Sequence, residues 1–278
     1  RALYLPRSWA EDPHRCDDAG IPTDKRGFAT KPTLAASLVA RTVAAKVPAA
    51  WVAGDEVYGA DPRLRTAIRG HGLGYVLAVS ANRRVPTQAG PIRVDRLPAE
   101  LPSWAWQKHS AGAGSHGQRY YSWAWIALLP EDDADTGAHH LLIRRNDTTG
   151  EHAYLRCYSP RPTTLHTLVT VAGQRWRIEE SFQTAKGLTG LDQHQVRRWT
   201  SWHRWTTLAM LAHALHTAMG VRRPQFSCRS CCLVRVAGAD HHRQAGLRPA
   251  ARQPATERAG AAHDADHHVG RAVTGHWG

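Results

Sequence analysis

The chain has 278 residues, a formal net charge of +13 at pH 7 and 42% hydrophobic residues. This length fits one large domain or two small ones, and no apolar run reaches the roughly 18 residues of a membrane span. The excess of Lys and Arg favours a polyanionic partner, because cationic side chains release counterions from a phosphate backbone. An Arg-rich and Ala-rich composition can also come from a GC-rich gene, whatever the protein does.

The cysteines and the first residues bear on the compartment and on the integrity of the chain. Five irregularly spaced cysteines argue against a disulfide framework and favour a reducing cytoplasm. The sequence has no secretory leader pattern. It begins Arg1-Ala2-Leu3-Tyr4 without an initiator Met, so we expect a fragment of a cytoplasmic protein.

The first predicted elements are short. Residues 1–8 are interpreted as the end of a strand, which Pro6 prevents from continuing as a central strand. Residues 9–32 are polar and predict a loop with at most a short helix. Apolar residues at helical spacing predict a helix over residues 33–46, with Thr33 as its N-cap.

An α/β pattern follows. A short apolar strand is predicted over residues 49–54, which places Asp55 just past its carboxyl end. A helix over residues 61–69 begins with Asp61 as N-cap and Pro at its first position. A second buried strand is predicted over residues 73–80. This strand–helix–strand order favours an α/β sheet.

Residues 82–164 change to short alternating runs separated by turn residues, which predicts antiparallel strands. Residues 146–150, Asn-Asp-Thr-Thr-Gly, are interpreted as a hairpin tip. Gly112, Gly114 and Gly117 form a Gly-rich stretch. A phosphate-binding loop is disfavoured there because no strand–loop–helix frame surrounds it.

A helix over residues 165–187 carries two different faces. Ile178, Phe182 and Ala185 recur at helical spacing and are predicted to pack inward. A carboxylate between cations on the adjacent face is either a solvated ion-pair ladder or a working site. This polar stripe consists of Arg175, Glu179, Gln183 and Lys186.

The last predicted helix covers residues 200–220, with Gly220 as its C-cap. His213 and His216 flank its apolar stripe and are interpreted as surface residues rather than metal ligands. The stripe expected to face the core consists of Trp205, Leu208, Leu211 and Leu215.

Residues 221–278 are rich in Arg, Ala, Gly and His and show no sustained apolar period. Such a segment cannot bury enough surface to offset chain entropy, so we predict a disordered tail. A shifted reading frame near residue 220 would produce this composition. Cys228, Cys231 and Cys232 with the His241-His242 pair suggest zinc, but their spacing fits no standard site.

Two stretches resemble motifs of the bacterial insertion-sequence transposases of the DDE class. Arg175, Glu179 and Lys186 match the signature around the third catalytic acid, and residues 51–59 resemble the strand that carries the second aspartate. The family often has Tyr three residues before the Arg, and here that position is Ala172. The resemblance covers about residues 1–220.

The resemblance implies an α/β fold, namely a partial ribonuclease-H-like catalytic domain over residues 1–220 with an antiparallel β insertion over residues 82–164. Asp55 and Glu179 would be the second and third acids, which in this class hold two Mg²⁺ ions about 4 Å apart. Arg175 and Lys186 would contact the backbone of double-stranded DNA at transposon ends.

The first acid of the family pattern would lie upstream of Arg1. Four aspartates fall in the predicted loop and match no strand motif: Asp12, Asp17, Asp18 and Asp24. The two-metal site is therefore incomplete, and we expect DNA cleavage and strand transfer to be impaired. Glu180 is the alternative third acid if the register differs by one residue.

The resemblance further implies a homodimer that acts at the bacterial nucleoid. Three other interpretations stay open. The chain could be a remnant that only binds DNA, a metal-dependent nuclease on the same scaffold, or a non-functional product.

Overall fold

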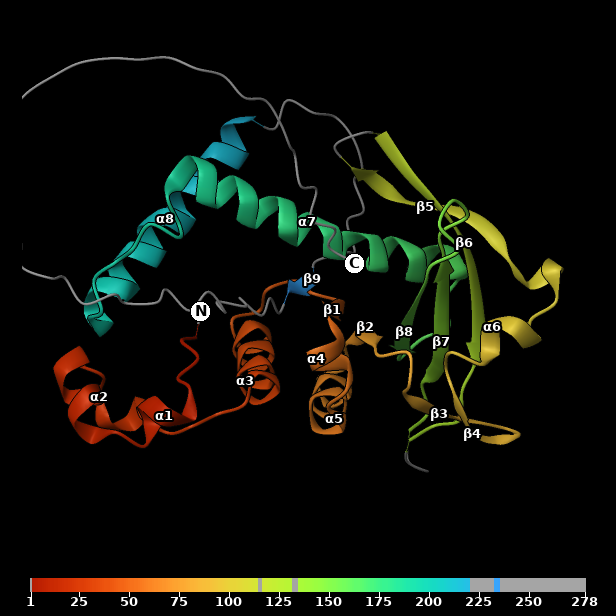
Figure 1. Ribbon diagram of the computed structural model, residues 1–278, viewed down its shortest axis with the longest axis horizontal. Helices are drawn as coiled ribbons and strands as arrows, with labels where there is room; N and C mark the ends of the chain where they lie inside the picture. The colour runs from red at the N-terminus through yellow and green to blue at the C-terminus, as the bar shows by residue number, and fades with distance from the viewer. Residues whose placement is uncertain (1, 115–116, 132–134, 221–232, 236–278) are drawn as a thin grey trace, which may run out of the picture. The chain divides into compact units, whose positions relative to one another are not determined.

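The computed structural model describes residues 2–114, 117–131, 135–220 and 233–235 (Figure 1). The α-helices are α1 (Arg7–Ala10), α2 (Pro13–Ala19), α3 (Lys31–Ala44), α4 (Glu56–Gly59), α5 (Pro62–Gly70), α6 (Leu97–Glu100), α7 (Leu165–Thr189) and α8 (Trp199–Gly220). The strands are β1 (Trp51–Gly54), β2 (Gly74–Val79), β3 (Arg84–Thr87), β4 (Gly90–Arg93), β5 (Gln107–Gly114), β6 (Gly117–Ala127), β7 (Ala138–Arg145), β8 (His152–Ser159) and β9 (Leu233–Arg235). Two 3₁₀ helices cover Thr23–Lys25 and Ser103–Ala105.

One mixed sheet has the strand order β5-β6-β7-β8-β2-β1-β9. β1 pairs in parallel with β2 and with β9, and every other pairing in this sheet is antiparallel. β3 and β4 form a separate two-stranded ribbon. The prediction of an α/β fold with antiparallel strands between residues 82 and 164 is confirmed, and the fold is compatible with a partial ribonuclease-H-like domain.

The antiparallel strands continue the α/β sheet rather than forming a sheet of their own. β8 pairs with β2 through five residue pairs, from Tyr75 opposite Tyr158 to Val79 opposite Tyr154. Residues 233–235, inside the segment for which no regular structure was expected, pair with β1 at the other end of the sheet. The rest of the predicted disordered tail, including its Cys and His residues, lies outside the described residues.

Helices cover the two faces of β1 and β2 (Figure 1). On one face, Val52 and Tyr75 pack with α3 and α5; on the other, Trp51 and Ala53 pack with the first half of α7. All four residues of β1 are buried. A strand buried on both faces is uniformly apolar, which is why residues 49–54 could be recognised from the sequence.

The amino-terminal prediction is wrong in part. Residues 1–8 do not end a strand, because α1 starts at Arg7, directly after Pro6. Asp12 is the N-cap of α2, and its side chain accepts a hydrogen bond from the Arg15 amide. The helix predicted over residues 33–46 is present as α3, two residues earlier in the chain. Its N-cap is Thr30 rather than Thr33, since the Thr30 hydroxyl accepts a hydrogen bond from the Thr33 amide at 3.3 Å.

α7 begins at the predicted residue 165 and extends two residues past the predicted end at residue 187. The Thr164 hydroxyl accepts a hydrogen bond from the Thr167 amide, and Gly190 ends the helix in the left-handed conformation. Ile178 and Ala185 are buried as predicted, but Phe182 is 39% exposed. Phe182 follows Ile178 by four residues, which turns it roughly 40° past Ile178 around the helix axis. Phe182 therefore lies at the edge of the buried face.

The predicted core stripe of α8 is wrong. Leu208 is 64% exposed and Leu211 54% exposed, while the buried residues of this helix are Thr206 and Ala209. Leu208 follows Thr206 by two residues, and Leu211 follows Ala209 by two. Residues two apart point in directions roughly 160° apart around a helix axis, so the apolar stripe lies opposite the buried side. α8 contacts α7, and its small residues are the ones that become buried.

A buried charge cluster links α5 to the inserted strands. The Glu131 carboxylate receives hydrogen bonds from the guanidinium groups of Arg65 and Arg69, each with a shortest distance of 2.6 Å. Arg156 on β8 adds an ion pair at 3.0 Å, and Arg69 also contacts Asp135 at 3.0 Å. Burial opposes the ionisation of Glu131, but the three arginines outweigh it and lower its pKa to about 2.

α7 and β5 approach each other closely at a glycine. β5 is irregular between Ser110 and Ala113, and the carbonyl oxygen of Ala111 points at Gly173 of α7. A Cβ atom on Gly173 would lie 2.0 Å from that oxygen. Only glycine allows this contact between helix and sheet.

We predict opposite effects for alanine at two glycines of α7. Gly173→Ala should lower the free energy of unfolding by about 1–3 kcal/mol, because the helix must move away from β5. Gly187→Ala should raise it by up to about 1 kcal/mol, because nothing lies within 4 Å of its Cβ position and alanine favours a helix. Urea titration of both variants measures the difference, and stabilisation by both would contradict the close contact.

Removal of the Glu131 charge should destabilise the fold. Glu131→Gln removes the carboxylate that Arg65, Arg69 and Arg156 share, and breaking such a buried pair costs about 3–5 kcal/mol. Because the folded pKa is lowered from 4.5 to about 2, this stabilisation is complete above about pH 4.5 and is lost as the pH falls toward 2. The free energy of unfolding, measured by urea titration at several pH values from 6 to about 2, should therefore depend less on pH for Glu131→Gln than for the unmodified chain. The exposed Glu151→Gln should match the unmodified chain within about 0.5 kcal/mol.

Candidate functional site

Asp55 follows the last residue of the buried strand β1 and is held by the backbone. Its side chain accepts a hydrogen bond from the Val57 amide at 3.0 Å and so caps α4. Asp61 plays the same capping role for α5, accepting from the Leu64 amide at 2.9 Å, as the sequence predicted. The cap fixes the Asp55 carboxylate at the carboxyl edge of the parallel strands, where α/β proteins often place functional groups.

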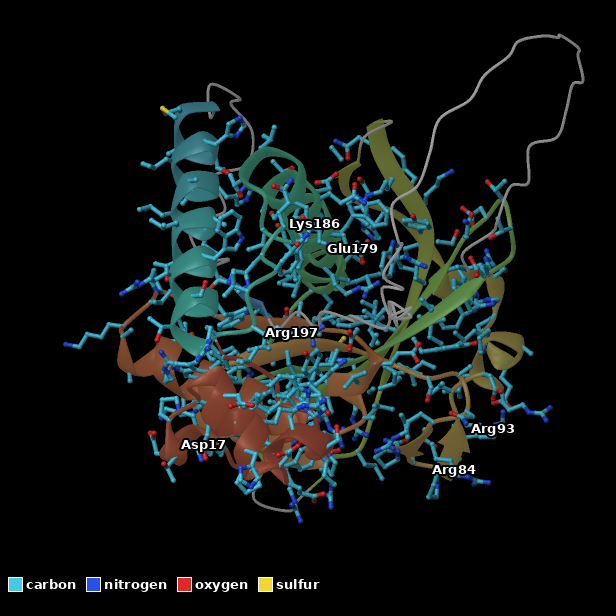
Figure 2. All side chains as sticks on the ribbon, turned by 60° about the vertical axis from the view of Figure 1, so that its left-hand side comes forward. Asp17, Arg84, Arg93, Glu179, Lys186 and Arg197 are labelled. Atoms are coloured by element: carbon cyan, nitrogen blue, oxygen red, sulfur yellow. The ribbon has the colours of Figure 1, made fainter. Side chains whose placement is uncertain are left out.

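Glu179 lies on the part of α7 beyond its apolar half. Leu168 and Ala172 belong to the cluster that packs on the sheet, and Arg175, Glu179 and Lys186 continue their stripe at helical spacing. The sheet-facing side of α7 thus changes from apolar to charged at Arg175. Figure 2 shows Glu179 and Lys186 on this helix, with Arg84 and Arg93 on the separate β3–β4 ribbon.

The structure brings part of the predicted polar stripe together. Arg175 and Glu179 form an i,i+4 ion pair at 3.9 Å, and the Glu179 side chain is 51% exposed. Such an exposed pair contributes only about 0.3–0.5 kcal/mol. No ion pair within 4.0 Å joins Lys186 to Glu179 in the described part of the chain. Glu179 is therefore accessible to solvent and only weakly engaged.

Asp55 and Glu179 come from elements that pack against each other, since Trp51 and Ala53 of β1 share a hydrophobic cluster with the first half of α7. No hydrogen bond or ion pair joins the two carboxylates within the described ranges. No group of three or more His, Cys, Asp or Glu side chains close enough to hold a metal ion occurs there either.

The two carboxylates fit Mg²⁺ in kind but not in number. Mg²⁺ prefers carboxylate oxygen and keeps waters and substrate phosphates as its other ligands. One oxygen of Asp55 is used by the helix cap, and among the described residues Glu179 forms a single ion pair, with Arg175 at 3.9 Å. The described residues therefore do not form a complete two-metal site.

Glu180 faces a different neighbour from Glu179. Its carboxylate accepts a hydrogen bond from the Trp176 indole at 3.2 Å, and the guanidinium of Arg119 on β6 lies 5.2 Å from the centre of that indole ring. Glu180 thus lies on the side of α7 that carries Gly173 and faces β5 and β6. It does not belong to the stripe of Arg175 and Lys186.

Sequence reasoning missed Arg119 and its neighbour Arg144, which lie on the sheet beside this part of α7. Burial lowers the pKa of Arg119, while Tyr121, Glu180 and Glu179 raise it and Arg144 lowers it further. Both glutamates of α7 are thus within electrostatic range of Arg119. The alternation of charged and aromatic residues in β6 was the only local signal, and it does not identify the partner helix.

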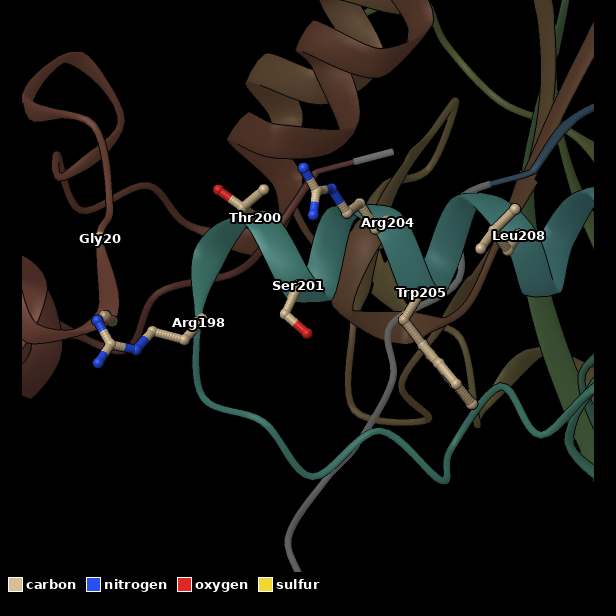
Figure 3. Close-up of a pocket in the computed structure, with 8 residues that line it drawn as sticks. Gly20, Arg198, Thr200, Ser201, Arg204, Trp205 and Leu208 are labelled. Carbon is tan, nitrogen blue, oxygen red and sulfur yellow. The ribbon is translucent and has the colours of Figure 1, made fainter.

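Two surface hollows lie near the beginning of α8, away from the carboxylates. One, of about 490 Å³, is shown in Figure 3, where Trp205 and Ser201 project to one side of α8 and Thr200 to the other, with Gly20 on a separate segment. The other, of about 670 Å³, is lined by Trp199, His203 and residues near the amino terminus. Neither Asp55 nor Glu179 lines them.

Among the described residues, no helix is long and apolar enough to cross a lipid bilayer.

Comparison with known proteins bears on the first part of the chain. No curated protein matches the sequence. Residues 1–100, which include β1, Asp55 and β2, match the family of DDE superfamily endonucleases. The match supports a relationship to the DDE-type endonucleases and transposases.

Proposed function

We propose that this chain is part of a DDE-type DNA transposase of a bacterial insertion sequence, which cleaves and joins DNA at transposon ends in its intact form. The observation that carries the proposal is the position of Asp55 at the carboxyl end of β1, inside the matched residues 1–100, together with Glu179 on the helix that packs against β1. In this proposal the two side chains are metal-binding acids.

Mg²⁺, when bound, would polarise the phosphate oxygens and stabilise the developing charge at the scissile bond. The chain's own residues prepare the site for such an ion. The helix cap holds the Asp55 carboxylate in one orientation. Glu179 is exposed and only weakly paired with Arg175, so its carboxylate stays free to turn toward an ion. Arg175 and Lys186 are positively charged and would contact backbone phosphates without reading bases.

We expect the chain alone to be a weak or inactive nuclease. The described residues provide two carboxylates for the metal and no cluster of three acidic or metal-binding side chains. A two-metal site that lacks one of its three carboxylates binds its ions poorly. The alternative function is a remnant that binds DNA without cutting it, which the net charge of +13 favours.

Three further features belong to this proposal. The DNA is double-stranded and comprises the transposon ends and a target site. The active form is a homodimer. The protein acts in the bacterial cytoplasm at the nucleoid.

The metal-binding acids can be located by iron-mediated backbone cleavage. Fe²⁺ with ascorbate and peroxide should cut the chain near residues 55 and 179, because hydroxyl radicals form at the bound ion, and excess Mg²⁺ should suppress both cuts. Asp55→Asn should abolish them, since it removes the charge while Asn still caps the helix. Mass spectrometry of the fragments gives the positions.

Asp61→Asn is the matched control, because Asp61 caps the next helix in the same way. It should leave both cuts intact. Cuts at only one of the two positions, or cuts that persist in Asp55→Asn, would show that Asp55 and Glu179 do not share a metal ion.

The DNA-related part of the proposal predicts salt-sensitive binding with little cutting. The chain should bind a mixed-sequence duplex, and the logarithm of the binding constant should fall linearly with the logarithm of the salt concentration. Nicking of supercoiled plasmid with Mg²⁺ should stay near background. Metal-dependent strand transfer that is lost in Asp55→Asn would contradict the expected impairment but support the transposase assignment. A chain that does not bind duplex DNA would refute the proposal.

A further inference from the structure

One face of the inserted strands carries arginines beside α7. Along β6, Arg119, Tyr121 and Trp123 alternate onto the same face of the sheet. Trp123 packs in the cluster formed with α7. On β7, Arg144 pairs opposite Trp123, so its side chain lies on this face too.

Arg119 is fixed against both the sheet and the helix. Its Nη2 atom donates hydrogen bonds to the carbonyl oxygens of Ala111 at 2.9 Å and Gly173 at 3.3 Å. Its guanidinium lies over the Trp176 ring, one helical turn from Glu179 and Glu180. The group is therefore held in place before any ligand binds, which lowers the entropy cost of binding.

Arg144 is supported in a similar way. Its guanidinium lies 4.7 Å from the centre of the Tyr121 ring. The Nε atoms of Arg119 and Arg144 are buried and have no hydrogen-bond partner in the described part of the chain. The buried Nε atoms are out of reach of a ligand, but an aromatic ring contacts only the flat face of a guanidinium, so the outer Nη atoms can still donate to an oxyanion.

These two arginines differ from those around Glu131. Within the described ranges, neither Arg119 nor Arg144 has a carboxylate within 4.0 Å, whereas Arg65 and Arg156 share Glu131. Two half-buried positive charges without a close counterion favour an anionic ligand. The same charges repel each other, since Arg144 lowers the pKa of Arg119, and an anion between them would remove that repulsion.

We infer that Arg119 and Arg144 form a phosphate-binding pair for the DNA backbone on the face of β6 and β7 beside the charged half of α7. The inference rests on the proposed function, because it takes the phosphate to belong to the DNA that the two acids act on. The planar guanidinium fork suits a phosphate, to which arginine can donate two parallel hydrogen bonds. The DNA would then run along the face of β6 and β7, next to the charged half of α7.

The test measures binding of the full chain to a short mixed-sequence duplex over a series of salt concentrations. Arg144→Gln should weaken binding roughly tenfold at low salt and reduce the slope of log affinity against log salt by about 0.9, the value for one lost phosphate contact. Arg119→Lys keeps the charge but not the planar fork, and should weaken binding several-fold with the slope unchanged.

Arg145→Gln is the matched control. It removes the same charge from the neighbouring residue of β7, whose side chain lies on the other face, over Trp106 and near Asp147. It should leave affinity and slope close to those of the unmodified chain. Thermal unfolding of all variants checks that they fold equally well.

Equal affinity and equal slope for Arg144→Gln and Arg145→Gln would overturn the inference. That result would leave the proposed function standing if the duplex still binds and the iron-mediated cuts still occur near residues 55 and 179. Failure of the unmodified chain to bind the duplex would instead refute both.

Discussion

The ladder between β2 and β8 is the interaction on which the arrangement of the molecule depends. β2 pairs with β1 in parallel on one side and with β8 in antiparallel orientation on the other. The strand next to Asp55 is thus joined through β2 and β8 to the strands that carry Arg119 and Arg144. Two further contacts reinforce this connection, the Glu131 cluster on the face of α5 and the Gly173 contact on the face of α7.

Five half-buried or buried arginines of the sheet and α5 fall into two groups with different physical roles. Arg65, Arg69 and Arg156 surround one carboxylate, and their charge serves to hold the chain segment around Glu131 against α5 and β8. Arg119 and Arg144 are supported by aromatic rings and backbone carbonyls instead. A carboxylate consumes positive charge, whereas a ring or a carbonyl orients it and leaves it available. The net charge of the chain alone does not distinguish these groups.

Local signals in the sequence predicted the elements whose causes are local. Asp61 before Pro62 marked a helix start, and the apolar run before Gly54 marked a buried strand. The position of Asp55 at the end of a strand followed from the same reasoning. These features depend on residues a few positions apart, so the chain order is enough to find them.

The wrong or missing predictions concern contacts between distant segments. Leu208 and Leu211 have the spacing of a core stripe, but α8 buries its opposite side. Glu131 and Arg65 are 66 residues apart, and Arg119 and Gly173 are 54 residues apart. Hydrophobic spacing predicts that a helix has an apolar face, but what that face meets is decided by the rest of the fold. Whether Asp55 and Glu179 hold a metal together is a question of the same kind.

The continuity of the sheet also limits how this architecture can change during evolution. Because β8 is hydrogen-bonded to β2 along its length, a residue gained or lost inside either strand would shift the register and turn every following side chain to the opposite face. The turn between β7 and β8 is different, since Asn146 and Gly150 close it locally and it lies outside the ladder. Relatives of this chain should therefore differ in length at such hairpin ends and keep the lengths of β2 and β8 constant.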